Sequence, residues 1–342
     1  MTSDGQSLPQ CSRRQTHFRV SRRCLGPNWQ NPTHRTCRGF TLPEALVSLA
    51  IVATLMALLL PAIHSSREAA RRTQCKNNLK EIGIAFALHL DSTQRYPTNG
   101  WGYGWIGDPD RGTDRHQPGG WIYCLLPYVE QNSLRYQGAG TPDFLRPSYM
   151  STAIQTPLPL FRCPSRPGVE LLPANPNVRP VNALWRSVVA KTDYAVNEGD
   201  YITNTTRGPL SLADGDKSDF PWTDVSKATG ICFLRSEVRP SDLGDGLSTT
   251  ILAGEKRVSS NHYSDDGDDG HDQSLLSGVD LDLNRWVISP PLRDGPSTEP
   301  RRFGSAHSAG CNMLFCDGSV RGIDYSVDQQ VFRHAGHRND GE

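Results

Sequence analysis

An unbroken apolar run over residues 45–63 is the feature that most constrains how this chain folds. No charged residue interrupts it, and Ser48 and Thr54 are its only polar members. Its length approaches the roughly 20 residues that an α-helix needs to cross the hydrocarbon core of a bilayer. The run therefore predicts a transmembrane segment over residues 40–63, with one carboxylate, Glu44, near its start.

Charge is distributed unevenly on the two sides of this segment. Of 36 basic and 36 acidic residues, seven arginines and one acid, Asp4, lie in residues 1–39, which leaves 29 basic and 35 acidic residues beyond. By the positive-inside rule, we expect a single pass through the inner membrane with the basic segment in the cytoplasm. The body would then lie in the periplasm or at the cell surface. Nucleic acid is not expected as a partner, because no basic patch remains in the body.

The helix is expected to continue through residues 64–92. Apolar side chains recur there every three or four positions, which is typical of an amphipathic helix packed on a globular body. They are Cys75, Leu79, Ile82, Phe86 and Leu90. Pro43 falls in the first turn, where no hydrogen bond is lost. Pro61 is interior and predicts a kink or local melting.

Residues 93–342 predict an extracytoplasmic domain rich in β-structure. Residues 121–136 favour a short helix, and residues 230–233 and 249–255 favour strands. Residues 311–323 predict a β-hairpin whose turn, Asp317-Gly318, has the preferred sequence of a type I′ turn. One long helix followed by mostly antiparallel strands is the α+β class.

Nine cysteines are present, of which three fall in residues 1–39. An even number of cysteines in an exported chain permits disulfides, although the sequence does not choose among the many pairings. The six that remain are Cys75, Cys124, Cys163, Cys232, Cys311 and Cys316.

Six short sequence blocks occur in order along residues 38–342. They are the segment around Gly39-Phe40, residues 67–72 with 75–83, residues 126–131, residues 163–165 with 193–195, residues 242–251 with 254–255, and residues 303–307 with 317–320. The last block places His307, Asp317 and Gly318 in an H-x9-D-G pattern. With these blocks the chain resembles the pseudopilin-like proteins, abundant in planctomycetes, that join a prepilin-type cleavage and methylation segment to a large C-terminal domain of unknown function.

The resemblance implies maturation by a prepilin peptidase. Cleavage is expected between Gly39 and Phe40, with loss of residues 1–39 and N-methylation of Phe40. Other pilin-like subunits are the implied partners, through the N-terminal helix. No catalytic activity is established for such proteins, so the chain is not expected to be an enzyme and no cofactor is implied.

Glu44 has two interpretations. After cleavage, the free amine of Phe40 would pair with this carboxylate within the chain or in a neighbouring subunit, which would make the charge tolerable at the membrane edge. Alternatively, Glu44 is an interfacial residue favoured by the helix dipole. A rival interpretation of residues 1–63 is an ordinary secretory signal or a plain membrane anchor. The apolar part of a secretory signal is usually about 7–15 residues, shorter than this run.

Two groups of residues are candidate metal ligands. The acidic loop could hold Ca²⁺, which clustered carboxylates bind, although no Glu closes it as in an EF-hand and a solvated loop is the simpler alternative. Its candidates are Asp265, Asp266, Asp268 and Asp269, with Asp272 beside them. A zinc set near the C-terminus fits no standard spacing, and its alternatives are a disulfide or a hairpin whose strands happen to carry cysteines. It comprises His307, Cys311, Cys316, His334 and His337. His307 with Asp317 could also suggest hydrolysis, but no G-x-S-x-G turn is present.

Aromatic residues alternate with glycine at Trp101, Tyr103 and Trp105. If exposed, they would form a platform that stacks on a sugar or a partner protein; alternatively, they anchor a loop to the body.

Two functional hypotheses follow. The first is a pseudopilin-like structural or assembly subunit of a type II secretion or type IV pilus-like system. The second is a membrane-tethered module that binds polysaccharide or a surface protein and uses the pilin leader only for export.

Overall fold

The computed structural model describes residues 40–168 and 170–341. The predicted leader, including Gly39, therefore lies outside the described residues. The chain divides into two units, one ending at Ala57 and one comprising Leu58–Glu342. Helix α1 (Leu42–Thr93) contributes to both.

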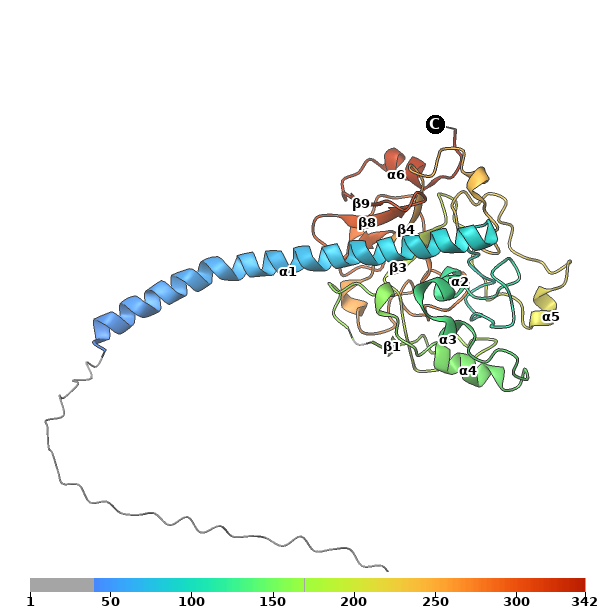
Figure 1. Ribbon diagram of the computed structural model, residues 1–342, viewed down its shortest axis with the longest axis horizontal. Helices are drawn as coiled ribbons and strands as arrows, with labels where there is room; N and C mark the ends of the chain where they lie inside the picture. Colours follow the sequence, from blue (N-terminus) through green and yellow to red (C-terminus); the bar gives the residue numbers. More distant parts are fainter. Residues whose placement is uncertain (1–39, 169, 342) are drawn as a thin grey trace, which may run out of the picture. The chain divides into compact units, whose positions relative to one another are not determined.

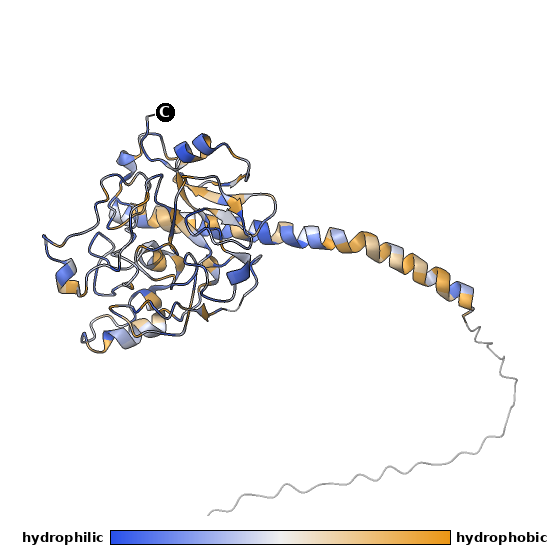
Figure 2. Cartoon of the chain, turned by 180° about the vertical axis from the view of Figure 1, so that it is seen from behind, coloured by the Kyte–Doolittle hydropathy of each residue, from blue (hydrophilic) through white to orange (hydrophobic). Residues whose placement is uncertain are grey.

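The first unit, where it is described, is the exposed apolar start of α1. The backbone N–H and the hydroxyl of Thr41 donate to Glu44 Oε2 over 2.9 and 2.8 Å, which satisfies a free N–H at the helix start as in a capping box. By length and composition, α1 is the one helix in the described part of the chain able to cross a membrane, and none of its apolar window is buried. Figure 2 shows this apolar stretch as a continuous band along the helix.

Pro61 lies inside α1 and does not interrupt it. The predicted local melting is therefore wrong. A proline removes a single hydrogen bond, and the helix is bonded for several turns on both sides of it.

The second unit contains the remaining elements. The other helices are α2 (Trp121–Leu125), α3 (Asn132–Arg135), α4 (Arg146–Ala153), α5 (Leu212–Gly215) and α6 (Gln329–Gly336), with 3-10 turns η1 (Leu126–Val129), η2 (Pro159–Phe161), η3 (Pro240–Asp242) and η4 (Ser260–His262). The strands are β1 (Leu172–Pro173), β2 (Val188–Val189), β3 (Tyr194–Asn197), β4 (Ile251–Glu255), β5 (Asn284–Arg285), β6 (Leu292–Arg293), β7 (Gly304–Ser305), β8 (Cys311–Phe315) and β9 (Val320–Ile323).

The main sheet has the strand order β5-β3-β4-β8-β9. Strands β3, β4, β8 and β9 pair antiparallel, and β5 joins β3 in parallel. One long helix on a largely antiparallel sheet is the predicted α+β class, which is confirmed. The register pairs Gly254 of β4 with Met313 of β8, so the next residue, Glu255, lies beside Asn312.

The second half of α1 packs along this sheet (Figure 1). Lys80 Nζ donates to the carbonyl of Gly318 in the β8–β9 turn over 2.7 Å, and Phe86 stacks on Trp121 of α2 at 5.6 Å. The buried residues repeat with the predicted spacing, so the amphipathic stripe is confirmed. They are Cys75, Asn78, Leu79, Ile82, Gly83, Ala85, Phe86 and His89.

The predicted hairpin is present, but its turn differs from the expected type I′. A type I′ turn needs two residues with positive φ, and here only Gly318 has one, at 77°. The loop has three residues, closed by the Phe315 N–H to the Ser319 carbonyl over 2.9 Å. Neighbouring backbone explains the change: the N–H groups of Cys316 and Asp317 donate to the carbonyls of Thr250 and Leu247.

The strand predicted over residues 230–233 is absent from the described structure. The backbone there turns instead, and the N–H groups of Gly230 and Ile231 donate to the carbonyls of Glu198 and Asn197. The apolar run reflects burial, since Ile231 and Cys232 are fully buried, and not pairing as a strand.

Candidate functional site

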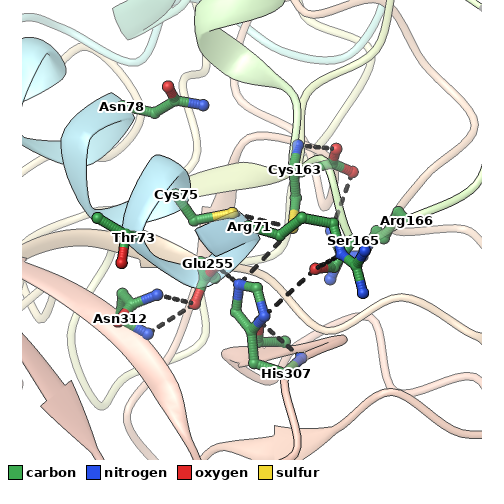
Figure 3. Close-up of polar contacts among 12 residues, drawn as sticks. Arg71, Thr73, Cys75, Asn78, Cys163, Ser165, Arg166, Glu255, His307 and Asn312 are labelled. Atoms are coloured by element: carbon green, nitrogen blue, oxygen red, sulfur yellow. Dashed lines mark hydrogen bonds and ion pairs between the residues drawn. The ribbon is translucent and has the colours of Figure 1, made fainter. Parts of the chain in front are cut away.

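Four buried side chains from distant parts of the sequence converge between α1 and the sheet. They are Cys75, Cys163, Glu255 and His307, here called the thiol–imidazole cluster, and one ligand atom from each lies within 4.8 Å of the others. None of the four residues is more than 3% exposed. Figure 3 shows them pointing toward one another from the helix, a loop and the sheet.

Each member comes from a different element. Cys75 is on the sheet-facing side of α1, and Cys163 follows η2 by two residues. Glu255 is the last residue of β4, and His307 lies two residues beyond β7. The cluster therefore forms only when α1 is docked on the folded body.

The contacts within the cluster are short. Cys75 Sγ lies 3.1 Å from Cys163 Sγ, and Cys163 Sγ lies 3.9 Å from His307 Nε2. The same imidazole nitrogen lies 3.2 Å from Glu255 Oε1. His307 Nε2 thus faces both a sulfur and a carboxylate.

The other nitrogen of His307 is held by α1. Its Nδ1 lies 2.6 Å from Glu68 Oε1, and Glu68 Oε2 accepts from Arg71 Nη2 over 2.6 Å and from Ser165 Oγ over 3.0 Å. Glu68, Arg71 and Cys75 are three and four residues apart, so they share one face of the helix. An imidazole whose Nδ1 is fixed by a carboxylate presents its Nε2 in a defined direction.

Hydrogen bonds hold two other members of the cluster, Glu255 and Cys163, in place. Asn312 donates to Glu255 Oε2 from its backbone N–H over 2.6 Å and from its side-chain amide over 3.0 Å. The N–H of Cys163 donates to Asp193 Oδ2 over 2.7 Å. Asp193 is held in turn by Arg166 Nη1 over 2.9 Å.

The cluster has an unusual charge distribution. Burial lowers the pKa of His307, but hydrogen bonds with Cys163, Glu255 and Glu68 outweigh this and raise it to about 10. A hydrogen bond from Cys75 lowers the pKa of Cys163 to about 6 against the effect of burial, with His307 assisting. The same bond raises the pKa of Cys75. Within the pair, Cys75 is thus the hydrogen-bond donor and Cys163 the acceptor.

Cys163, His307 and Glu68 are arranged in space like a catalytic nucleophile, its general base and the carboxylate that orients the base. One observation argues against that chemistry: Cys163 is only 3% exposed, so a substrate has little access to its sulfur. Two thiols, an imidazole and a carboxylate are, in contrast, ligand types that hold transition metals. The six cysteines of the described chain are all free thiols.

The residues weighed as a zinc set near the C-terminus do not converge. His307 belongs to the cluster, but the other four predicted ligands do not join it. Cys311 packs in an apolar cluster around Phe303 and Phe332. His337 gathers with Asp245 and Asp340, and His334 Nδ1 lies 2.6 Å from that same Asp340.

The actual partners Cys75, Cys163 and Glu255 were missed by reasoning from spacing, because their separation in sequence is too large. A signal was nevertheless present: each of the four residues lies in a different one of the sequence blocks on which the family resemblance rests.

The H-x9-D-G pattern separates into two roles. His307 belongs to the cluster, whereas Asp317 stabilises the β8–β9 turn, where its Oδ1 accepts the N–H of Ser319 over 2.8 Å. Gly318 supplies the positive φ of that turn.

The predicted calcium ligands do not converge. Within the described residues, Asp265, Asp266, Asp268 and Asp269 form no common cluster of ligand atoms. The Asp268 carboxylate accepts the N–H groups of Ser259 and Gly270, so it supports the loop instead.

Asp272, the fifth acid of that loop, converges instead with two acids outside it, Asp280 and Asp282. Burial, with Asp282 close by, raises the pKa of Asp272 to about 9, and that of Asp280 is raised by the same causes. Lys256 Nζ lies 3.6 Å from Asp282 Oδ1. Protons and this lysine therefore compensate the charge of the group.

The aromatic platform is wrong for two of its three residues. Trp101 and Trp105 are 0% and 1% exposed, and Tyr103 is half-buried. The two indoles pack edge to face at 5.2 Å and donate to the carbonyls of Arg115 and Pro209. They anchor their loop to the body, as the alternative interpretation held.

Comparisons with known proteins agree with the sequence blocks. Residues 34–60 match the prokaryotic N-terminal methylation motif, and residues 64–330 match a family described as protein of unknown function (DUF1559). No curated protein and no solved structure matches the chain. The methylation motif indicates a type IV pilin-like substrate of a prepilin peptidase, anchored in the membrane by a single helix. Since the second match covers well over half of the chain, the protein belongs to the DUF1559 family, in the prepilin-type form that carries an N-terminal methylation motif.

Proposed function

We propose that the mature protein is a pseudopilin-like assembly subunit of a type II secretion or type IV pilus-like system. In this role it packs with like subunits through α1 in the inner membrane, and its body lies on the periplasmic or outer side. The role requires no catalytic step by this chain.

The apolar surface of α1 carries this proposal. Between Leu42 and Ile63 the large apolar side chains are exposed all round the helix; Leu46 is 59% exposed, Leu55 54% and Leu60 57%. A helix that is apolar on every face is buried in lipid or among other helices. Anchoring in lipid requires only the apolar run. The carboxylate of Glu44 in the first turn, in contrast, needs a partner of opposite charge.

The hydrogen bonds of Glu44 leave room for such a partner. Both bonds from Thr41 use Oε2, so Oε1 is available to an amine. Prepilin cleavage would create that amine at Phe40, next to Thr41. A neighbouring subunit, offset along the helix, would bring its own amine to the same carboxylate.

The test is Glu44→Ala in cells that carry the native assembly machinery. We expect normal cleavage of the leader, because the scissile bond is unchanged. Incorporation into sheared surface material or into cross-linked assemblies should fall by about tenfold or more, the effect of losing about 1.4 kcal/mol per subunit contact. Glu81→Ala is the matched control, because Glu81 is an exposed acid on the same helix beyond the membrane segment. Wild-type incorporation of Glu44→Ala would refute the proposed role of the carboxylate.

A second candidate, a membrane-tethered binding module, is favoured by a cavity of about 620 Å³ beside α1. Its volume is in the range of ligand pockets. It lies between Gln74 and Asn78 of the helix and residues 157–168 of the body, with Lys191 on its wall. If the full-length protein does not self-associate through α1, this candidate becomes the better account.

A further inference from the structure

We propose that the thiol–imidazole cluster binds one Zn²⁺ ion, with Cys75, Cys163, Glu255 and His307 as its four ligands. This inference is independent of the assembly role, since it concerns only the second structural unit.

The donor set matches zinc. Thiolate sulfur, imidazole nitrogen and carboxylate oxygen are the three ligand types of zinc, which takes four of them in a tetrahedron at structural sites. Calcium and magnesium bind oxygen ligands in larger shells, and two thiols would disfavour them. The ligands come from four separate segments, as expected where a metal links parts of a fold.

The size of the cluster also fits. Zinc bonds of about 2.3 Å to sulfur and about 2.0 Å to nitrogen or oxygen place tetrahedral ligand atoms about 3.3–3.8 Å apart. The distances here are 3.1 Å between the two sulfurs, 3.9 Å from Cys163 Sγ to His307 Nε2, and 3.2 Å from His307 Nε2 to Glu255 Oε1. All remaining ligand pairs lie within 4.8 Å. Side-chain shifts of about 1 Å would complete the tetrahedron.

The groups behind the ligands supply a second, independent observation. Metal-bound histidine commonly donates its other N–H to a carboxylate, which fixes the ring and the tautomer. His307 Nδ1 has this partner in Glu68 Oε1 at 2.6 Å. Glu68 is itself held by Arg71, so its charge is already compensated.

Glu255 is likewise held in place by a neighbouring residue. Asn312 occupies Oε2 with two hydrogen bonds, whereas the buried Oε1 has only His307 Nε2 beside it, at 3.2 Å. A buried carboxylate oxygen needs a proton donor or a cation to compensate its charge. The oxygen faces His307 Nε2, so a metal between the two would satisfy both atoms.

Two of the ligands border pockets. A pocket of about 580 Å³ beside α1 is lined by His307 and by helix residues that include Ser65, Glu68 and Lys76. Cys163 lines the 620 Å³ cavity. Because all four ligands are protein side chains, the site is of the closed, structural kind. Zinc would therefore tie α1 to the body and stabilise the docked helix.

The chief competing state is a disulfide between Cys75 and Cys163, whose sulfurs are neighbours. The two states have different requirements. Zinc needs both sulfurs as reduced thiolates and also binds His307 and Glu255. A disulfide consumes both thiols and involves neither His307 nor Glu255. The experiment separates them.

The test measures metal in the full-length protein, purified in detergent without chelator and equilibrated with zinc, followed by removal of unbound ions. We expect one zinc per chain by elemental mass spectrometry.

Replacement by Co²⁺ should give the visible bands of tetrahedral cobalt with thiolate-to-cobalt charge transfer. Cys163→Ser and Glu255→Gln should lose the tight zinc and change these bands. Cys316→Ser, a half-buried cysteine outside the cluster, should keep both.

A conservative variant guards against misfolding. Glu68→Gln keeps all four ligands and alters only the support of His307, so it should still bind one zinc but about 10–100-fold more weakly in competition with a chelator. Three results would overturn the proposal: a folded wild-type chain without zinc, equal zinc retention by Cys163→Ser, or a Cys75–Cys163 disulfide in the non-reduced peptide map of the native protein.

Discussion

At the residue scale, the interior contains ionisable groups whose charge must be compensated locally. Arg166, 6% exposed, is paired with Asp193 and with Asp294 over 2.9 and 2.8 Å. Removing one partner of such a buried pair is strongly destabilising, by about 3–5 kcal/mol, because the other charge remains buried. The pairing of Asp193 also fixes the backbone of Cys163, so the charges of the core and the geometry of the cluster depend on each other.

Glu198 is the opposite case, a buried acid without a cation. It is fully buried and accepts from Thr203 and Asn284, and burial raises its pKa to about 8. The folded protein therefore holds a proton here that the unfolded chain releases near the ordinary pKa of glutamate.

This arrangement predicts a pH dependence of stability. Below about pH 4.5, Glu198 makes its full contribution to the free energy of unfolding. This contribution is lost as the pH rises toward about 8, because unfolding then releases a proton. The loss should amount to a few kcal/mol. Urea unfolding of the wild type and of Glu198→Gln, measured near both limits, should show a steeper decline for the wild type. Glu81→Gln should behave as the wild type, and equal declines in all three proteins would contradict the assignment.

At the element scale, α1 combines two kinds of helix. Its first part is exposed and apolar, and its second part buries one face on the sheet. Both patterns are local in sequence, so the helix was predictable almost to its ends. The β8–β9 hairpin was predictable for the same reason, but its turn type was not, because backbone carbonyls of residues 247 and 250 determine it.

The hairpin gives a sharp test at this scale. Gly318 has φ 77°, where a Cβ is strained although the space around it is open. Gly318→Ala should therefore destabilise the body by about 1 kcal/mol through backbone strain alone. Gly112→Ala is the matched control, since its surroundings are equally open and its φ is not positive. Chemical denaturation of both variants checks this, and equal stabilities would exclude strain at the turn.

At the scale of the whole molecule, the sequence was informative where contacts are local and uninformative where they are distant. Cys75 and Cys163 are 88 residues apart, and Cys163 and His307 are 144 apart. No periodicity connects such positions, so the cluster could not be derived from spacing. The burial of Trp101 likewise depends on Trp222, which packs on it at 5.4 Å. Membership of the family blocks was the only pointer to the cluster that the sequence contained.

The two matches cover different parts of this molecule. The methylation motif covers the segment that enters the membrane, and the DUF1559 match covers the helix that docks on the body and the body itself. The proposed assembly role depends on the first of these being processed, because cleavage creates the amine that pairs with Glu44.

The most direct test is therefore mass spectrometry of the N-terminus of the protein purified from its native membranes. We predict a chain that begins with N-methylated Phe40, which establishes maturation as a prepilin. An intact leader, or a chain that begins beyond residue 60, would contradict this account and leave a membrane-tethered or exported binding protein in its place.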